Sequence, residues 1–125
     1  MTQRIVFPTD EHHGLLARRG AHFGRAAFYT IVDISDDGSV SDVSVVENEG
    51  HESGGCGNAV NAICSLGADA LVVSGIGASP LKGFMNRGLR VFRDTVSGNV
   101  HASLHALLAN RLTPMQLQQS CSHHH

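Results

Sequence analysis

The segment Glu47-Asn48-Glu49-Gly50-His51-Glu52-Ser53-Gly54-Gly55-Cys56-Gly57-Asn58 divides the chain into two parts with different periodicities. It follows a run of β-branched residues and precedes apolar residues at helical spacing, so a helix is expected to begin near Asn58. Its four glycines allow positive φ angles and bring backbone N–H groups close to an approaching group. With an imidazole at His51 and a thiol at Cys56, close to the expected helix start, the segment is either a flexible turn or a binding loop.

The part that precedes this segment reads as three strands. Residues 4–9 form a short apolar run that ends near Pro8, and residues 27–34 form a longer β-branched and aromatic run. Asp36-Asp37-Gly38-Ser39 predicts a hairpin turn, because an Asp-Gly pair tolerates positive φ angles. Residues 40–47 are then the antiparallel partner of residues 27–34.

The part that follows it alternates between helices and strands. Helical spacing predicts a helix that Gly67 ends, with Cys64 on its apolar face, and the continuous apolar run 69–74 predicts a buried strand. After the loop Gly75-Ile76-Gly77, Ser79 is expected to cap a helix that has Pro80 at its first position. That helix should direct three apolar residues inward (Leu81, Phe84 and Met85) and end at Gly88. A strand over 89–92 and a helix that begins at 97–99 complete the pattern.

The expected order is therefore β-β-β-α-β-α-β-α, which predicts an α/β protein with a mixed five-stranded sheet flanked by helices. A single domain is expected over residues 1–112, followed by a polar, disordered tail over 113–125 that carries Cys121 and His123-His124-His125. The three terminal histidines are either a natural metal-binding tail or the remnant of a purification tag. Ligands of such sheets collect where loops leave the carboxyl ends of parallel strands, as the loop at Gly75 to Gly77 does.

The composition is typical of an ordinary globular protein, with 42% hydrophobic and 16% charged residues. The formal net charge of −2 gives no electrostatic support for binding nucleic acid, and no apolar run reaches membrane-spanning length. The beginning of the chain does not read as a signal peptide, so a cytoplasmic location is expected. Three cysteines, an odd number, without a C-x-x-C pair favour reduced thiols over a disulfide framework.

Several short motifs, taken in order, resemble one known family. They are His22-Phe23-Gly24-Arg25-Ala26 before 28–33, then Val46-Glu47-Asn48, His51 with Gly54-Gly55 and Gly57, Gly67-Ala68-Asp69, Gly75-Ile76-Gly77 and Gly88-Leu89-Arg90-Val91. In this ordered set, which spans roughly residues 4–112, the chain resembles the dinitrogenase iron–molybdenum cofactor biosynthesis proteins. That family includes the NifX-like carriers and the orange protein.

The resemblance implies a ribonuclease-H-like fold without nuclease chemistry, and the binding, carrying or assembly of a metal–sulfur cluster rather than catalysis. It places His22 and His51 near the cluster, and Cys56 is a third candidate metal ligand. Arg25 and the glycines of the two loops are expected to frame the cofactor (Gly54, Gly55, Gly57, Gly75 and Gly77). Other cluster-assembly proteins are the expected partners, and a link to nitrogen fixation is implied but does not follow from the fold.

Two alternatives stay open. A magnesium-dependent phosphodiester hydrolase on the same fold would need clustered carboxylates, for which Asp10 at the end of the first strand is the only well-placed candidate. Asp33 and Asp69 also lie at strand ends, but nothing in the sequence indicates that they converge. A small interaction module could instead buffer divalent metals with its histidines and tail. His101 and His105 have the i, i+4 spacing that permits chelation on a helix, but Ala102 stands where a metalloprotease motif has glutamate. Gly75-Ile76-Gly77 does not continue into a dinucleotide fingerprint, because Pro80 takes the position of its last glycine.

Overall fold

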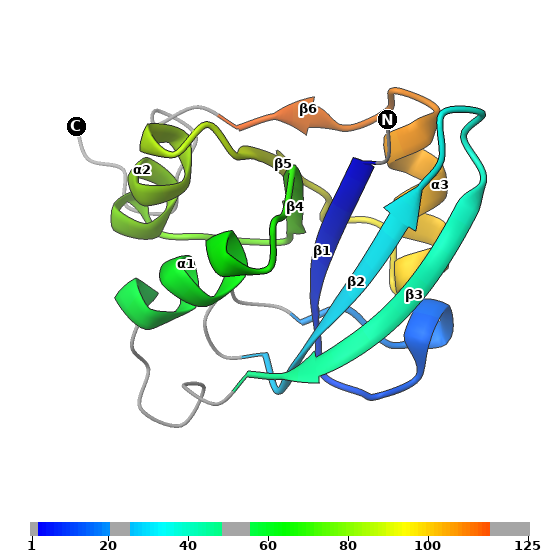
Figure 1. Ribbon diagram of the computed structural model, residues 1–125, viewed down its shortest axis with the longest axis horizontal. Helices are drawn as coiled ribbons and strands as arrows, with labels where there is room; N and C mark the ends of the chain where they lie inside the picture. Colours follow the sequence, from blue (N-terminus) through cyan, green and yellow to red (C-terminus); the bar gives the residue numbers. More distant parts are fainter. Residues whose placement is uncertain (1–2, 21–25, 49–55, 116–125) are drawn as a thin grey trace.

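The protein is described here from a computed structural model, which covers residues 3–20, 26–48 and 56–115; of residues 56–59 it gives the backbone course. The elements are β1 (Gln3–Thr9), the 3-10 turn η1 (Gly14–Leu16), β2 (Phe28–Ile34), β3 (Val40–Glu47), α1 (Cys56–Ser65), β4 (Ala70–Val73), α2 (Ala78–Asn86), β5 (Arg90–Arg93), α3 (Val100–Leu108) and β6 (Thr113–Pro114). Figure 1 shows α1 and α2 on one side of the sheet and α3 on the other. No helix in the described ranges is long and apolar enough to cross a membrane.

The six strands form one mixed sheet in the order β3-β2-β1-β4-β5-β6. β1, β4 and β5 run parallel to one another, while β2 is antiparallel to both β1 and β3. The mixed α/β architecture expected from the sequence is therefore confirmed. The hairpin turn is confirmed as well: Gly38 has a φ of 85°, and its N–H donates to the Ser35 carbonyl at 2.9 Å.

The expected count of five strands is wrong, because β6 pairs with β5 in an antiparallel direction. The N–H of Met115 donates to the Val91 carbonyl at 2.7 Å, and the Met115 side chain is buried among the residues beneath α1 and α2. The ordered sheet thus extends through Met115, so the polar tail expected from residue 113 cannot begin there. A two-residue edge strand that contains Pro114 has too little β-branched character to stand out in a sequence pattern.

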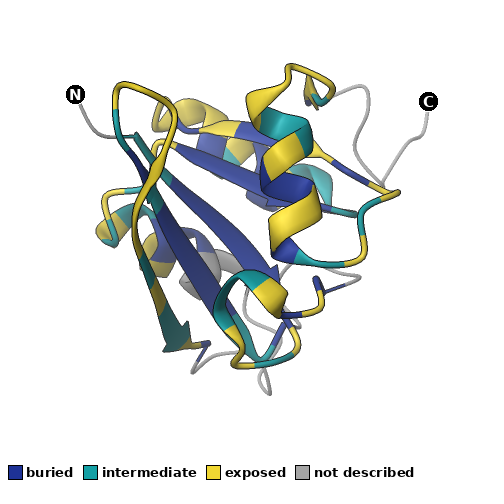
Figure 2. Cartoon of the chain, turned by 90° about the vertical axis from the view of Figure 1, so that its right-hand side faces the viewer, coloured by how far each residue is buried: buried dark blue, intermediate teal, exposed yellow. Residues whose placement is uncertain are grey.

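Alternating side chains divide the core between the two faces of the sheet. Val6, Leu71 and Val73 face α1 and α2, where they pack with Ile63, Leu81 and Phe84. The alternate strand positions pack against α3 and η1, and include Ile5, Phe7, Val72, Phe92, Val100 and Leu104. Figure 2 shows the resulting band of buried strands behind the more exposed helix α3. Cys64 is half-buried against the first of these clusters, in agreement with a packing role.

Three local expectations need correction. The N-cap of α2 is Gly77 rather than Ser79, so Pro80 lies third in the helix, still within the first turn where a missing N–H costs little. Met85 points to solvent, with 42% of its surface exposed, because Leu81 and Phe84 already fill the inward stripe. Pro8 does not end the first strand but lies inside β1, which continues to Thr9. The Pro8 carbonyl accepts a hydrogen bond from the Gly20 N–H on the side of β1 that faces away from β2. This position lies beyond the last β1 residue that pairs with β4.

Candidate functional site at the carboxyl edge of the sheet

The parallel strands β1, β4 and β5 all end at one edge of the sheet, which we call the carboxyl edge. Its last strand residues are Thr9, Val73 and Arg93. Because β2 is antiparallel to β1 and β3, β2 begins and β3 ends at this same edge. The carboxyl ends of parallel strands are where open α/β sheets hold their ligands.

The residues that flank segments 21–25 and 49–55 are tied together at the carboxyl edge. Gly20, which precedes segment 21–25, donates its N–H to the Pro8 carbonyl at 2.9 Å, and a Cβ at Gly20 would lie 3.1 Å from that of Ala26. Asn48, which precedes segment 49–55, donates its N–H to the Ala27 carbonyl at 2.9 Å and its side-chain amide to the Ala26 carbonyl at 2.8 Å. Both segments therefore leave the sheet from neighbouring positions (lower part of Figure 1).

A third loop, Gly75-Ile76-Gly77, connects the end of β4 directly to the start of α2. Ile76 is buried and anchors the loop, whereas Gly77 caps the helix in an extended conformation and offers no side chain to the first-turn amides. The φ of Gly77 is −75°, and a Cβ there would meet the Pro80 ring at an ordinary 3.7 Å. The start of α2, which has no side-chain cap, thus places a partial positive charge at the carboxyl edge.

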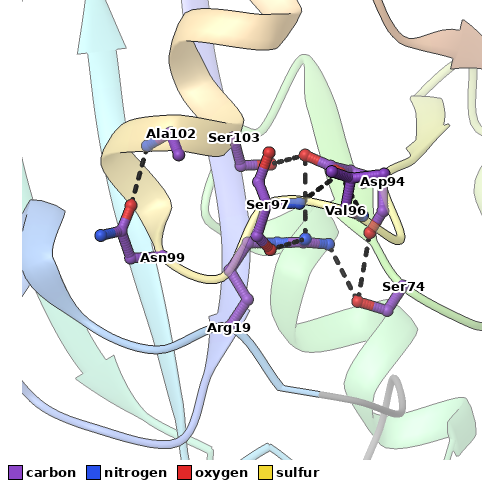
Figure 3. Close-up of polar contacts among 8 residues, drawn as sticks. All are labelled: Arg19, Ser74, Asp94, Val96, Ser97, Asn99, Ala102 and Ser103. Carbon is purple, nitrogen blue, oxygen red and sulfur yellow. Dashed lines mark hydrogen bonds and ion pairs between the residues drawn. The ribbon is translucent and has the colours of Figure 1, made fainter.

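A polar cluster, formed by Arg19, Ser74, Asp94, Ser97 and Ser103, lies at the carboxyl edge, and its members Arg19, Asp94 and Ser103 are buried (Figure 3). The Arg19 guanidinium donates to the Ser97 carbonyl at 2.9 Å and to the Ser74 hydroxyl at 3.1 Å, and lies 3.8 Å from an Asp94 carboxylate oxygen. The side chains of Arg19 and Asp94 are 3% and 2% exposed. A charged pair in this setting holds its position only when further hydrogen bonds satisfy both groups.

Asp94 receives most of those hydrogen bonds. The N–H groups of Val96 and Ser97 each donate to its Oδ1 at 3.0 Å, and the Ser103 hydroxyl donates to its Oδ2 at 2.8 Å. Burial acts to raise the pKa of Asp94, but the hydrogen bonds from Ser97, Val96 and Ser103 outweigh it and hold the pKa at about 2. Burial lowers the pKa of Arg19, and the charge of Asp94 opposes that shift. Both groups are therefore charged at neutral pH.

The polar cluster joins three segments of the chain at the carboxyl edge. Arg19 precedes segment 21–25 by two residues, Ser74 precedes Gly75, and Asp94 opens the loop that ends at the Asn99 cap of α3. No sequence motif indicates this polar cluster. Asp94 follows the end of a strand, and an aspartate at such a position is a recognisable turn signal. Nothing in the neighbouring sequence, however, indicates its partner Arg19, which is 75 positions away along the chain.

Among the predicted site residues, Gly75 and Gly77 lie at the carboxyl edge next to Ser74. Cys56 and Gly57 are the first two residues of α1. The other five predicted residues lie outside the described ranges: His22, Arg25, His51, Gly54 and Gly55.

The carboxylates that a hydrolase would need do not come together. Asp33 accepts two hydrogen bonds from the Arg4 side chain, at 2.8 and 3.1 Å, and Asp69 accepts one from the Arg4 backbone at 2.8 Å. Both therefore lie at the start of β1, whereas Asp10 follows its end at the carboxyl edge. Within the described residues no group of three His, Cys, Asp or Glu side chains is arranged to hold a metal ion.

The sequence of residues 3–110 matches the family model for the dinitrogenase iron–molybdenum cofactor proteins. The chain belongs to this family. Its fold is shared with solved relatives, including the protein PH0822, which is 27% identical (TM-score 0.76; 90% of this chain and 96% of that one aligned). The apo form of the orange protein from Desulfovibrio gigas is 22% identical (TM-score 0.77; 91% and 97% aligned).

A third relative, a Thermotoga protein of the DUF35 family solved by NMR, is 24% identical (TM-score 0.75; 97% of each chain aligned). The resemblance to NifX-like and orange-protein-like chains is therefore confirmed. No curated protein matches the sequence. Membership in this family associates the chain with iron–molybdenum cofactor binding or biosynthesis.

Proposed function

We propose that this protein binds and carries a metal–sulfur cluster, similar to the iron–molybdenum cofactor or to another iron- or molybdenum-containing sulfide, and does not catalyse a reaction on it. The observation that carries this proposal is the family match over residues 3–110. Such clusters are anionic, and the carboxyl edge offers an anion the start of α2, whose first-turn amides have no side-chain cap.

We place the cluster at the carboxyl edge, with His22, His51 and Cys56 as metal ligands and Arg25 as a contact for its negative charge. The hydrogen bonds of Gly20 and Asn48 support this placement, because they fix the points from which segments 21–25 and 49–55 leave the sheet. Cys56 opens the ten-residue helix α1, and a helix start stabilises a thiolate. Gly54, Gly55, Gly57, Gly75 and Gly77 would present backbone amides to the cluster sulfides.

The sheet supports the ribonuclease-H-like motif that the family resemblance implies. Its first five strands lie in the order β3-β2-β1-β4-β5, with β2 antiparallel to its neighbours. We further propose that the protein works in the cytoplasm and exchanges its cluster with other assembly proteins. A nitrogenase pathway is one such setting.

Anaerobic reconstitution tests the proposed ligands. The full-length chain, with Cys121→Ser and His123→Ser/His124→Ser/His125→Ser to silence the tail, is incubated with iron, molybdate and sulfide, and then desalted. We expect a coloured species with stoichiometric metal and sulfide, because the thiolate and imidazoles remain. Adding His22→Ala/His51→Ala/Cys56→Ala should remove at least nine-tenths of the bound metal, in line with the loss of ligands from a metal site.

The matched control replaces two histidines and one cysteine elsewhere in the same background, as His12→Ala/His13→Ala/Cys64→Ala. The two histidines are exposed and Cys64 packs against the core, so cluster uptake should equal that of the parent. If the control loses as much metal as the triple variant, the ligands are not those proposed. If the parent takes up no cluster at all, the carrier function itself is refuted.

A further inference from the structure

Two histidines lie one turn apart on the outer face of α3. His101 and His105 are both exposed, and their i, i+4 spacing puts the Cβ atoms about 5–6 Å apart on one face of the helix. This spacing lets two imidazoles reach one metal ion. Figure 2 looks onto the outer face of α3, where exposed residues form bands along the helix.

The helix between the two histidines is held firmly from its inner side. Ser103 is buried and donates its hydroxyl to Asp94 at 2.8 Å, while Leu104 is 4% exposed within the core. The side chain of Asn99 accepts from the Ala102 N–H at 2.8 Å and fixes the start of the helix. Because the backbone is already ordered, a metal that bridges the two rings would have to restrict only the two side chains.

No charged side chain on α3 itself opposes a cation. α3 contains no lysine or arginine, so no fixed positive charge on the helix opposes a bound metal ion. His105 lies in the last turn, where the unpaired carbonyls give the helix end a partial negative charge. No carboxylate lies on α3 either, so the ligand set is imidazole alone, which suits zinc, nickel and copper better than magnesium or calcium.

We propose that His101 and His105 form a bidentate surface site for a borderline divalent cation of the Zn²⁺, Ni²⁺ or Cu²⁺ class. The remaining coordination positions are left to water or to a ligand from another molecule. The site is separate from the proposed cluster site, because α3 covers the opposite face of the sheet from α1. It uses none of the proposed cluster ligands and stands whether or not a cluster is bound.

Calorimetric titration with Ni²⁺ tests this site in the full-length chain, with Cys121→Ser and His123→Ser/His124→Ser/His125→Ser to silence the tail and His22→Ala/His51→Ala/Cys56→Ala to remove the proposed cluster ligands. We expect one Ni²⁺ per chain, and His105→Ala should weaken its binding at least tenfold because one of two protein ligands is lost. A composition-matched variant, His105→Ala/Ala109→His, retains two exposed histidines, one in α3 and one at its C-cap, but separates them by eight residues, about 12 Å along the helix axis. It should bind as weakly as His105→Ala.

The melting temperature distinguishes Ni²⁺ binding at the His101–His105 site from weak, non-specific association of Ni²⁺ with the protein. Ni²⁺ at saturation should raise the melting temperature of the parent, because the chelate exists only in the folded helix, and should leave the composition-matched variant unchanged. His12→Ala, at an exposed position outside α3, should retain the parent affinity. The proposal is overturned if the composition-matched variant binds Ni²⁺ within threefold of the parent, or if the parent binds none.

Discussion

Replacing Asp94 by alanine is expected to lower the free energy of unfolding by about 3–5 kcal/mol, because it leaves the buried Arg19 guanidinium without its counter-charge. The substitution also removes the acceptor for the N–H groups of Val96 and Ser97 and for the Ser103 hydroxyl. Urea unfolding followed by circular dichroism measures the change. A loss of less than about 1 kcal/mol, the usual value of an exposed ion pair, would mean that the polar cluster around Arg19 and Asp94 is open to water.

Two further variants isolate the cause. Asp37→Ala removes an exposed carboxylate that bonds Ser39 within the β2–β3 turn, and should cost far less than Asp94→Ala. Arg19→Met in the Asp94→Ala background should recover part of the loss, since no unpaired charge is then buried. A double variant as unstable as the sum of the two single variants would contradict a coupled pair.

The Asp94 carboxylate also makes the free energy of unfolding depend on pH, and the fold should lose stability as the pH falls. The pKa of Asp94 in the folded protein is about 2, below its ordinary value of 3.8, so ionised Asp94 stabilises the fold above about pH 4. This contribution, about 2 kcal/mol by the size of the pKa shift, is lost as the pH falls from 4 toward 2. The stability difference between the wild-type protein and Asp94→Ala should therefore narrow over that interval, and a constant difference would contradict the assignment.

Phe84→Ala is the second substitution expected to have a large effect, with a loss of about 3–5 kcal/mol in unfolding free energy. The Phe84 side chain is fully buried between α2 and the sheet, together with Leu81 and Val91. Its removal takes an aromatic ring out of a close-packed layer that cannot collapse around the gap. Chemical denaturation of the purified variant measures the loss.

The neighbouring residue provides a matched control. Met85 lies beside Phe84 in the chain but faces solvent, so Met85→Ala should cost less than about 1 kcal/mol. Equal losses at the two positions would mean that α2 is rotated relative to the orientation described here. This comparison tests directly the position of α2, Met85, that the sequence pattern assigned incorrectly to the inward face.

The elements that could be predicted are those whose signals are local. Asp37-Gly38 predicts a turn, and the uninterrupted apolar run of β4 predicts a strand that is buried on both faces. Asn99 indicates the start of α3, because its side chain caps the helix. In each case a few adjacent residues decide the backbone conformation. Pairing across the sheet adds to these preferences but does not reverse them.

The features that escaped prediction depend on tertiary contacts. β6 exists because β5 offers it an open edge, and Gly77 caps α2 because the buried Ile76 sets where the chain turns. The Arg19–Asp94 pair joins positions 75 residues apart, and each of its members alone reads as an ordinary surface charge. For the candidate site, the topology of the parallel strands predicted the edge, whereas the polar cluster at that edge required the folded chain.

The most direct test of the account maps the cluster onto the protein by amide NMR, with the full-length, tail-silenced chain compared before and after anaerobic loading. Cluster binding at the carboxyl edge predicts shifted or broadened signals at Gly75, Gly77 and Asn48, which lie at or beside the loops of that edge. Signals at the opposite edge, such as those of Gly67 and Asp69, should stay unchanged. Changes confined to the opposite edge, or a metal-loaded protein whose carboxyl-edge signals do not move, would contradict the account.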